Sequence, residues 1–319
     1  MAGLSIDTLA VHAGQPPDPV SGAVMVSIVL STTFAQSAPG QHQGFEYGRS
    51  GNPTRNALEA CVASLEGGDH GFAFASGLGA STTVLSSLQP GDHVLSGDDV
   101  YGGTFRLMDK VMRPLGIDSS RVDMVDLDAV ARALRPTTKL VWLETPTNPM
   151  LKIFDIAAIC ELAKRHGARV IVDNTFATPV LQRPLELGAA VVLHSSTKYL
   201  NGHSDVIGGA VVTSDAELAE RLRFLQNAMG AVPSPFDCYL VLRGLKTLGV
   251  RVRQATSSAR QIAAKLASHP AVERVLYPGL ASHPGHALAT RQMKDFGAMI
   301  SFIVKGGLPA SRAFLAHLS

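Results

Sequence analysis

Six short apolar runs, separated by stretches of helical length, constrain the fold of this chain more than any other feature. They predict strands at 72–76, 93–97, 139–144, 169–174, 190–195 and 208–213. Apolar strands that alternate with helices form crossover units, and therefore a mostly parallel sheet with helices on both faces. An apolar fraction of 46% with 17% charged residues supplies a sizeable core for this α/β fold.

The 319 residues exceed one average domain and predict one large and one small domain. Residues 1–50 lack periodicity, so we expect an extended N-terminal arm. A helix begins near Pro53 and ends at Gly67-Gly68, which opens a large domain over 51–240. A long helical run from Pro235 to about His269 leads into a smaller domain, 241–319, with a solvated Lys/Arg-rich face.

Charge and targeting signals exclude several classes of protein. The net charge is +2 with both signs spread along the chain, which predicts no nucleic-acid partner and no membrane surface. No apolar run approaches the roughly 18 residues of a transmembrane helix, and no secretory signal is visible, so we expect a soluble cytoplasmic protein. The three cysteines form no CxxC pair, and Cys61 and Cys160 lie on apolar helix faces, which predicts buried thiols.

Ligands of an open parallel sheet bind beyond the carboxyl ends of its strands. Ser76-Gly77-Leu78-Gly79 follows the first strand and opens a helix, whose free N–H groups and positive end suit a phosphate. The stretch is neither a GxGxxG fingerprint nor a P-loop, and in isolation a Ser-capped helix with a tight turn explains it equally well.

Three further side chains stand at such strand ends. Asp173 is either a partner for a protonated ring nitrogen or an ordinary cap of the next turn. Tyr101 is either a stacking plate or a packing tyrosine. Lys198 follows an apolar run and is either a surface lysine at a strand end or a buried one. Burial would lower its pKa and leave an amine able to attack a carbonyl.

The combination is more specific than its parts. A lysine amine, a carboxylate, an aromatic plate and a phosphate cradle are what pyridoxal 5'-phosphate (PLP) requires, whereas a nicotinamide cofactor needs no lysine. No metal is expected, because the histidines show neither HExxH nor a Cys/His spacing, and the serine-hydrolase elbow GxSxG is absent. The histidines without a metal-binding spacing are His194, His203, His283 and His286.

The chain resembles the Cys/Met-metabolism family of fold-type I PLP enzymes, which includes cystathionine γ-lyase, γ-synthase and β-lyase and methionine γ-lyase. The resemblance is carried, in the family's order, by VHAGQPPDP, YGRSGNPTR, FASGLGA, YGGTFRL, ETPTNP, VDNTFATP, HSSTKYLNGHSDVIGG and PSPFDCYLVLRGLKTL. These stretches cover essentially the whole chain.

The resemblance implies a role for each matching residue. Lys198 would carry the cofactor covalently and act as the base, Asp173 would pair with the pyridine nitrogen, and Tyr101 would stack over the ring. The remaining cofactor-binding residues would be Ser76, Gly77, Leu78, Ser195 and Thr197 at the phosphate, Asn148 at the ring oxygen, and Tyr47 and Arg49 at a neighbouring subunit's phosphate. An active site shared between subunits implies an obligate homodimer, usually within a homotetramer.

The implied activity is γ-elimination on cystathionine, a transsulfuration step that gives cysteine, 2-oxobutyrate and ammonia. The alternative is the γ-synthase reaction, in which cysteine replaces the activating group of an activated homoserine. Methionine γ-lyases often carry a cysteine at the position of Gly103, so this glycine argues against methionine γ-lyase. The family's ESLGG-like stretch and its R-x-S-[VI]-G-like segment, whose arginine binds the substrate carboxylate, are absent, and Arg312 does not match. We therefore expect either a fragment of a longer enzyme or a truncated PLP-binding paralogue without catalysis.

Overall fold

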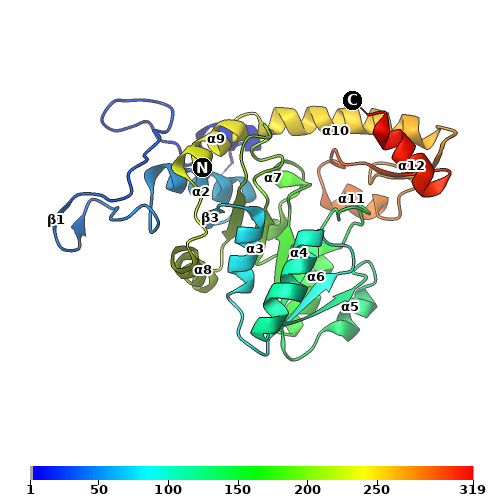
Figure 1. Cartoon of the computed structure of the whole chain (residues 1–319), viewed down its shortest axis with the longest axis horizontal. Helices are drawn as coiled ribbons and strands as arrows, with labels where there is room; N and C mark the ends of the chain where they lie inside the picture. The colour runs from blue at the N-terminus through cyan, green and yellow to red at the C-terminus, as the bar shows by residue number, and fades with distance from the viewer. Residues whose placement is uncertain (1–2, 319) are drawn as a thin grey trace.

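The computed structural model describes residues 3–318 and centres on one seven-stranded sheet (Figure 1). The strand order is β3-β9-β8-β7-β6-β4-β5. β9 runs antiparallel to both β3 and β8, and the other neighbours are parallel, so all strands except β9 point the same way. The strands are β3 His70–Phe74, β4 His93–Gly97, β5 Asp118–Val122, β6 Thr138–Glu144, β7 Arg169–Asp173, β8 Val191–His194 and β9 Gly209–Thr213.

The apolar runs therefore form strands, which confirms the predicted fold class, with two differences. β3 begins and ends two residues earlier than predicted, so Ser76 caps the next helix instead of ending the strand. β5 was not predicted, because its sequence DSSRV is polar. β5 lies at the edge of the sheet and pairs with a neighbouring strand on one side only, so it can carry polar residues.

Helices cover both faces of the sheet, because successive side chains of a strand point to opposite faces. Val94 belongs to a buried cluster that includes residues of helices α3 (Gly77–Leu85) and α8 (Ala216–Met229). Its neighbour Leu95 belongs to another cluster, which includes residues of α5 (Leu127–Ala133) and α6 (Ile156–Arg165). The helical segments of this domain are α2 Pro53–Glu66, α3 Gly77–Leu85, α4 Gly102–Arg106, η1 Leu107–Met112, η2 Arg113–Leu115, α5 Leu127–Ala133, α6 Ile156–Arg165, α7 Thr178–Leu181, η3 Pro184–Leu187 and α8 Ala216–Met229.

The helical run after Pro235 is two helices, α9 Pro235–Leu245 and α10 Leu248–Ala267, so the prediction of one continuous run is wrong. The carbonyl oxygen of Gly244 accepts from Nη2 of Arg251 (2.8 Å) and from the N–H of Thr247 (3.2 Å). A continuing α-helix would offer this oxygen to the N–H four residues later. The arginine therefore stabilises the break between the two helices.

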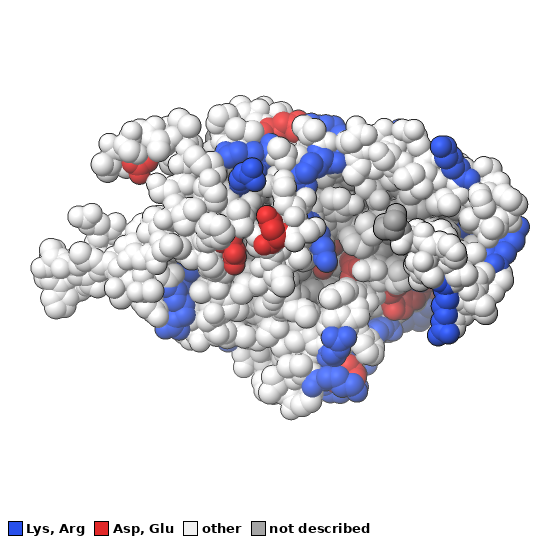
Figure 2. Space-filling model, turned by 45° about the horizontal axis from the view of Figure 1, so that its top comes forward, with Lys and Arg blue, Asp and Glu red and all other residues white. Residues whose placement is uncertain are grey.

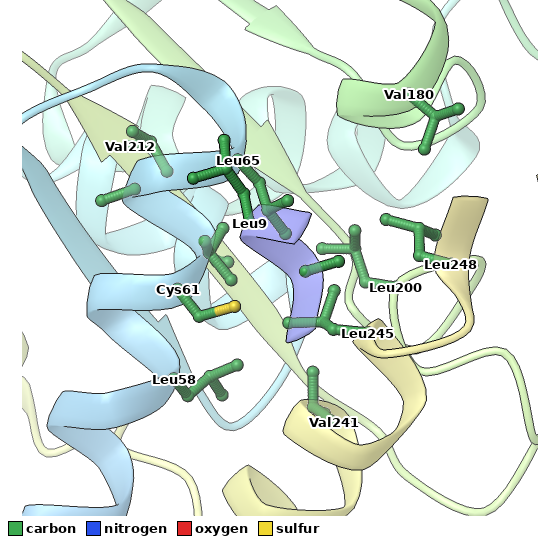
Figure 3. Close-up of a cluster of buried hydrophobic side chains, with 14 of the residues drawn as sticks. Leu9, Leu58, Cys61, Leu65, Val180, Leu200, Val212, Val241, Leu245 and Leu248 are labelled. Atoms are coloured by element: carbon green, nitrogen blue, oxygen red, sulfur yellow. The ribbon is translucent and has the colours of Figure 1, made fainter. Parts of the chain in front are cut away.

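The N-terminal segment is only partly an extended arm. Residues Ile6–His12 form helix α1, and Leu9 lies in the apolar cluster between α2 and α9 (Figure 3). The expectation of an extended chain is therefore wrong here, because the stripe of Leu9, Ala10 and Ala13 is short but fully used in packing. The following residues run over the surface to the small hairpin of β1 Gln36–Ala38 and β2 Gln41–His42, which projects from the body (Figure 1).

The C-terminal elements lie together beside the far half of α10, at the right of Figure 1. β10 Val272–Leu276 pairs antiparallel with β11 Ser301–Val304, accompanied by α11 His286–Gln292 and α12 Gly307–Ala316. The domain boundary near residue 240 stays a prediction. Within residues 3–318 no helix is both long and apolar enough to cross a membrane, and Cys61, Cys160 and Cys238 are buried free thiols.

Candidate functional site

A cavity of about 340 Å³ lies at the carboxyl ends of the parallel strands. We call it the strand-end cavity. It brings together nine of the eleven residues predicted for the site, contributed by segments that follow β3, β4, β6, β7 and β8. Its lining comprises Ser76, Gly77, Leu78, Ser81, Tyr101, Thr104, Glu144, Asn148, Asp173, Thr175, Phe176, Leu193, Ser195, Thr197, Lys198 and Ile207.

One end of this cavity is the start of helix α3. The side-chain oxygen of Ser76 caps the helix by accepting from the N–H of Gly79 (2.9 Å). The N–H groups of Gly77 and Leu78 come first in the helix, so they have no acceptor within it. A Cβ at Gly77 would lie 3.0 Å from Cβ of Ser195, so glycine allows the helix start to approach the serine closely. Helix dipole, free N–H groups and a hydroxyl thus face one point, which suits an anion.

Thr197 closes the same end of the strand-end cavity. Its hydroxyl donates to the carbonyl oxygen of Gly208 (3.2 Å) and accepts from the N–H of that residue (3.0 Å). These bonds fix the turn that carries Lys198 against the chain entering β9.

The opposite end of the strand-end cavity is acidic. One carboxylate oxygen of Asp173 accepts from the N–H of Thr175 (3.0 Å). Burial raises the pKa of Asp173, while its hydrogen bonds to Thr175 and the charge of His194 oppose that shift. A half-buried carboxyl of this kind is ready to bind a cationic N–H donor.

Glu144 is a site residue to which the sequence assigned no role. It is the last residue of β6 and accepts from the N–H of Tyr101 (2.8 Å). Burial raises its pKa well above the ordinary value, and the nearby carboxylates of Asp173 and Asp99 raise it further. Its position at a strand end was the available signal, and its partner on another loop was not visible from the sequence.

Tyr101 stands at the mouth of the strand-end cavity, before α4, with half of its surface exposed. Its ring lies against Gly103, where any Cβ would overlap the ring. Glycine at position 103 therefore allows the present orientation of the tyrosine. A larger residue there would displace the ring.

Lys198 lies where the strand-end cavity meets a second hollow of about 980 Å³, which we call the outer cavity. The lysine is exposed, so the expectation that burial activates it is wrong: the turn after β8 carries it out of the sheet. Asn148 and Phe176 also line both hollows. The outer cavity is further lined by Thr197, Tyr199, Gly202, Ser204, Asp205, Val206, Ile207, Arg251, Ala255 and Met299.

Tyr47 and Arg49 do not reach the strand-end cavity of their own chain. They line a separate shallow hollow together with Val232, Pro233 and Pro235. Nη1 of Arg49 donates to the carbonyl oxygen of Asn227 (2.8 Å), and its guanidinium lies 5.5 Å from the centre of the Tyr47 ring. Both side chains are exposed.

Residues 7–319 match a family described as "Cys/Met metabolism PLP-dependent enzyme". The chain is 57% identical over 309 residues to a probable cystathionine gamma-synthase of Herpetosiphon aurantiacus, with 97% of each chain covered. It is 55% identical over 312 residues to a cystathionine beta-lyase of Coxiella burnetii, with 97% of this chain and 81% of the relative covered. A crystal structure of cystathionine gamma-lyase from Lactobacillus plantarum, complexed with L-serine, matches with a TM-score of 0.96 at 49% identity, covering 99% of this chain and 82% of that one.

This chain belongs to the Cys/Met metabolism family of PLP-dependent enzymes. It is therefore an enzyme of lyase or transferase type in transsulfuration, with PLP as its cofactor. Relatives named synthase and lyase match about equally well, so membership of the family leaves the reaction itself open.

The strand-end cavity of this family member fits PLP in its donor set. The start of α3 with Ser195 suits the phosphate, Asp173 suits a protonated ring nitrogen, and Tyr101 offers a ring face. Lys198 supplies the amine that must reach the cofactor's carbonyl carbon. Among residues 3–318, no three His, Cys, Asp or Glu side chains are grouped as a metal site would require.

Proposed function

We propose that this chain catalyses γ-elimination on cystathionine, which with one water gives cysteine, 2-oxobutyrate and ammonia. The supporting observation is the position of Lys198, between a cavity that suits the cofactor and an open cavity that suits a substrate. The outer cavity, at about 980 Å³, is large enough for an amino acid with a long side chain.

Each site residue then has a defined role. Bound PLP withdraws electrons from the substrate Cα when its ring nitrogen is protonated. Asp173 holds that proton, and the start of α3 with Ser195 and Thr197 holds the phosphate, while Asn148 orients the ring oxygen. Nζ of Lys198 would hold the cofactor in the resting enzyme, and as a free amine it would take the proton from the substrate Cα. Tyr101 covers the ring and helps to deprotonate the incoming substrate amine.

Replacing Lys198 tests this assignment. Lys198→Ala is expected to abolish the visible absorbance of the bound cofactor and to lower 2-oxobutyrate formation by at least about a thousandfold, the loss typical for a covalent catalytic residue. Lys139→Ala, which changes an exposed lysine of β6 outside both cavities, is the matched control. A yellow Lys198→Ala protein with an unchanged spectrum would disprove the role of the lysine.

Two other activities remain as alternatives. The γ-synthase reaction joins cysteine to an activated homoserine, and the name of the Herpetosiphon aurantiacus relative favours it. The other alternative is a protein that binds PLP without catalysis, and Arg251 of the outer cavity favours it. The guanidinium of Arg251 donates hydrogen bonds to Thr247, Tyr199 and Gly244, so it is not free to bind a substrate carboxylate. Incubation with cystathionine, and separately with cysteine and O-succinylhomoserine, distinguishes the three.

We further propose that the protein is a homo-oligomer, in the cytoplasm, whose subunits share active sites. Tyr47 and Arg49 are exposed and do not line the strand-end cavity of their own chain. They would instead bind the cofactor phosphate of a neighbouring subunit. Sedimentation analysis of the holoenzyme tests the assembly, for which we expect a dimer or a dimer of dimers.

A further inference from the structure

The residues beside Asp173 and Ser195 turn away from the strand-end cavity. Asn174 follows Asp173 at the end of β7, and His194 precedes Ser195 at the end of β8. Because successive side chains of a strand point to opposite faces, both lie on the side of the sheet that carries α2. Both are completely buried.

These two neighbours share one acceptor. A single oxygen of Glu66, Oε1, accepts from Nε2 of His194 (2.6 Å) and from Nδ2 of Asn174 (2.8 Å). Glu66 is the last residue of α2 and is also completely buried. Charge-assisted bonds of this length are strong, and a buried carboxylate without them would be costly.

The same set of buried bonds extends to a third strand end. Nε2 of Gln182 donates to Oδ1 of Asn174 (3.1 Å) and to the carbonyl oxygen of Thr145 (3.0 Å), directly after β6. The carbonyl oxygen of Gln182 also accepts from Nδ2 of Asn174 (2.8 Å). These hydrogen bonds therefore link the ends of β6, β7 and β8 on the side of the sheet that faces away from the cavity. Glu66 links β7 and β8, the two strands that end beside Asp173 and Ser195.

We propose that Glu66 is a positioning residue for the cofactor. Through His194 and Asn174 its one oxygen fixes the spacing between Asp173, which binds the ring nitrogen, and Ser195, which binds the phosphate. The carboxylate thereby sets the affinity for PLP at both ends of the molecule, although it touches neither. This inference rests on the proposed roles of Asp173 and Ser195.

Two substitutions of His194 separate positioning from simple core packing. Glutamine places its amide nitrogen where Nε2 lies, whereas asparagine places it where Nδ1 lies, an atom without a hydrogen-bond partner in this structure. His194→Asn is expected to raise the Kd of the apoenzyme for PLP by about tenfold or more, the effect of losing a bond to a charged group, and His194→Gln to restore it. The circular dichroism of the bound cofactor should change and recover in parallel.

His93 offers a matched control. It is buried as completely as His194, and its ring nitrogens contact side-chain oxygens of Thr138 and Ser120 (2.8 Å each), at the opposite end of the sheet. His93→Asn should lower the melting temperature of the apoenzyme and leave the Kd for PLP unchanged. Equal losses of affinity in His93→Asn and His194→Asn would mean that both act through stability alone, and would overturn the proposal.

Two further variants keep the test decisive. If His194→Asn does not fold, Asn174→Ser removes the second donor to Glu66, and unchanged PLP affinity in that variant would equally refute positioning. Asp173→Asn tests the underlying assignment. If it weakens PLP binding while His194→Asn and Asn174→Ser do not, the positioning role fails and the proposed function stands; if it has no effect, the assignment of Asp173 itself is wrong.

Discussion

Three carboxyl groups crowd the ends of the parallel strands at Glu144, Asp173 and Asp99. Glu144 is buried and faces the charges of the other two, which raises its pKa well above the ordinary value of about 4.3. The folded protein therefore holds this proton at a pH where the unfolded chain has released it. The contribution of Glu144 to stability therefore falls as pH rises from about 4.3 toward the raised pKa.

Glu144→Gln should remove this loss of stability while keeping an oxygen to accept from the N–H of Tyr101. In urea unfolding of the apoenzyme, the advantage of the variant over wild type should grow with pH above about 5. It should reach about 1.4 kcal/mol for each unit by which folding raises the pKa. Parallel stability curves for the two proteins would contradict the burial of an uncompensated charge.

At the residue scale, the sequence predicted which residues lie together where they belong to a local motif, while their roles stay predictions. Lys198, Asp173 and the Ser76–Leu78 turn were identified from their place after apolar runs, and the structure brings them to one cavity. The buried set around Glu66 was not predictable, because its partners lie 108 and 128 positions away. Only the register of the sheet brings such residues together.

Among the secondary-structure elements, α2 and β3 pack unusually closely. A Cβ on Gly71 of β3 would overlap the carbonyl oxygen of Glu59 of α2. The contact is between the backbone of β3 and the backbone of α2, so no side-chain rotation can relieve the overlap. The glycine is therefore required by packing and not by backbone conformation.

Gly71→Ala is expected to lower the free energy of unfolding by about 1–3 kcal/mol, as overpacking usually does. Gly102→Ala is the control, since a Cβ there would have nothing within 4 Å, and we expect no loss of stability. Denaturant unfolding of both apoenzymes measures the difference. A neutral Gly71→Ala would show that the helix can move away from the strand freely.

Elements with a strong apolar period were predictable, whereas those defined by tertiary contacts were not. β4 was predicted with its observed bounds, because all its residues are buried. β5 was not predicted because an edge strand tolerates polar residues. The break between α9 and α10 was not predicted because the side chain of Arg251, four residues after the break, stabilises it. In each case the deciding partner lies outside the segment.

At the scale of the whole molecule, the net charge of the chain is only +2. The face drawn in Figure 2 shows lysine and arginine scattered among acidic residues without a field of one sign. The exposed apolar side chains of the N-terminal arm, such as Val20 (95% exposed) and Leu30 (67%), are a better indication of contact with another chain. They fit the proposed homo-oligomer.

Mixed oligomers test the sharing of active sites. Lys198→Ala retains an intact arm and Arg49→Ala retains an intact lysine, so each alone should lose most activity. Co-produced, they should recover up to about a quarter of wild-type activity, because half of random dimers are mixed and each mixed dimer has one complete site. No recovery would mean that Arg49 serves its own chain or no site.

β3 lies at the edge of the sheet and has β9 as its only partner strand, so the strand that leads into the turn at Ser76–Leu78 depends on residues 209–213. During synthesis β3 leaves the ribosome long before that partner exists, and Phe72 and Phe74, fully buried in the finished sheet, stay uncovered until then. We therefore expect that a nascent chain shorter than about residue 213 cannot yet hold β3 and the turn at Gly77 in place. Cofactor binding is then expected late in the synthesis of this enzyme, and the exposed Phe72 and Phe74 are an expected site of aggregation until β9 forms.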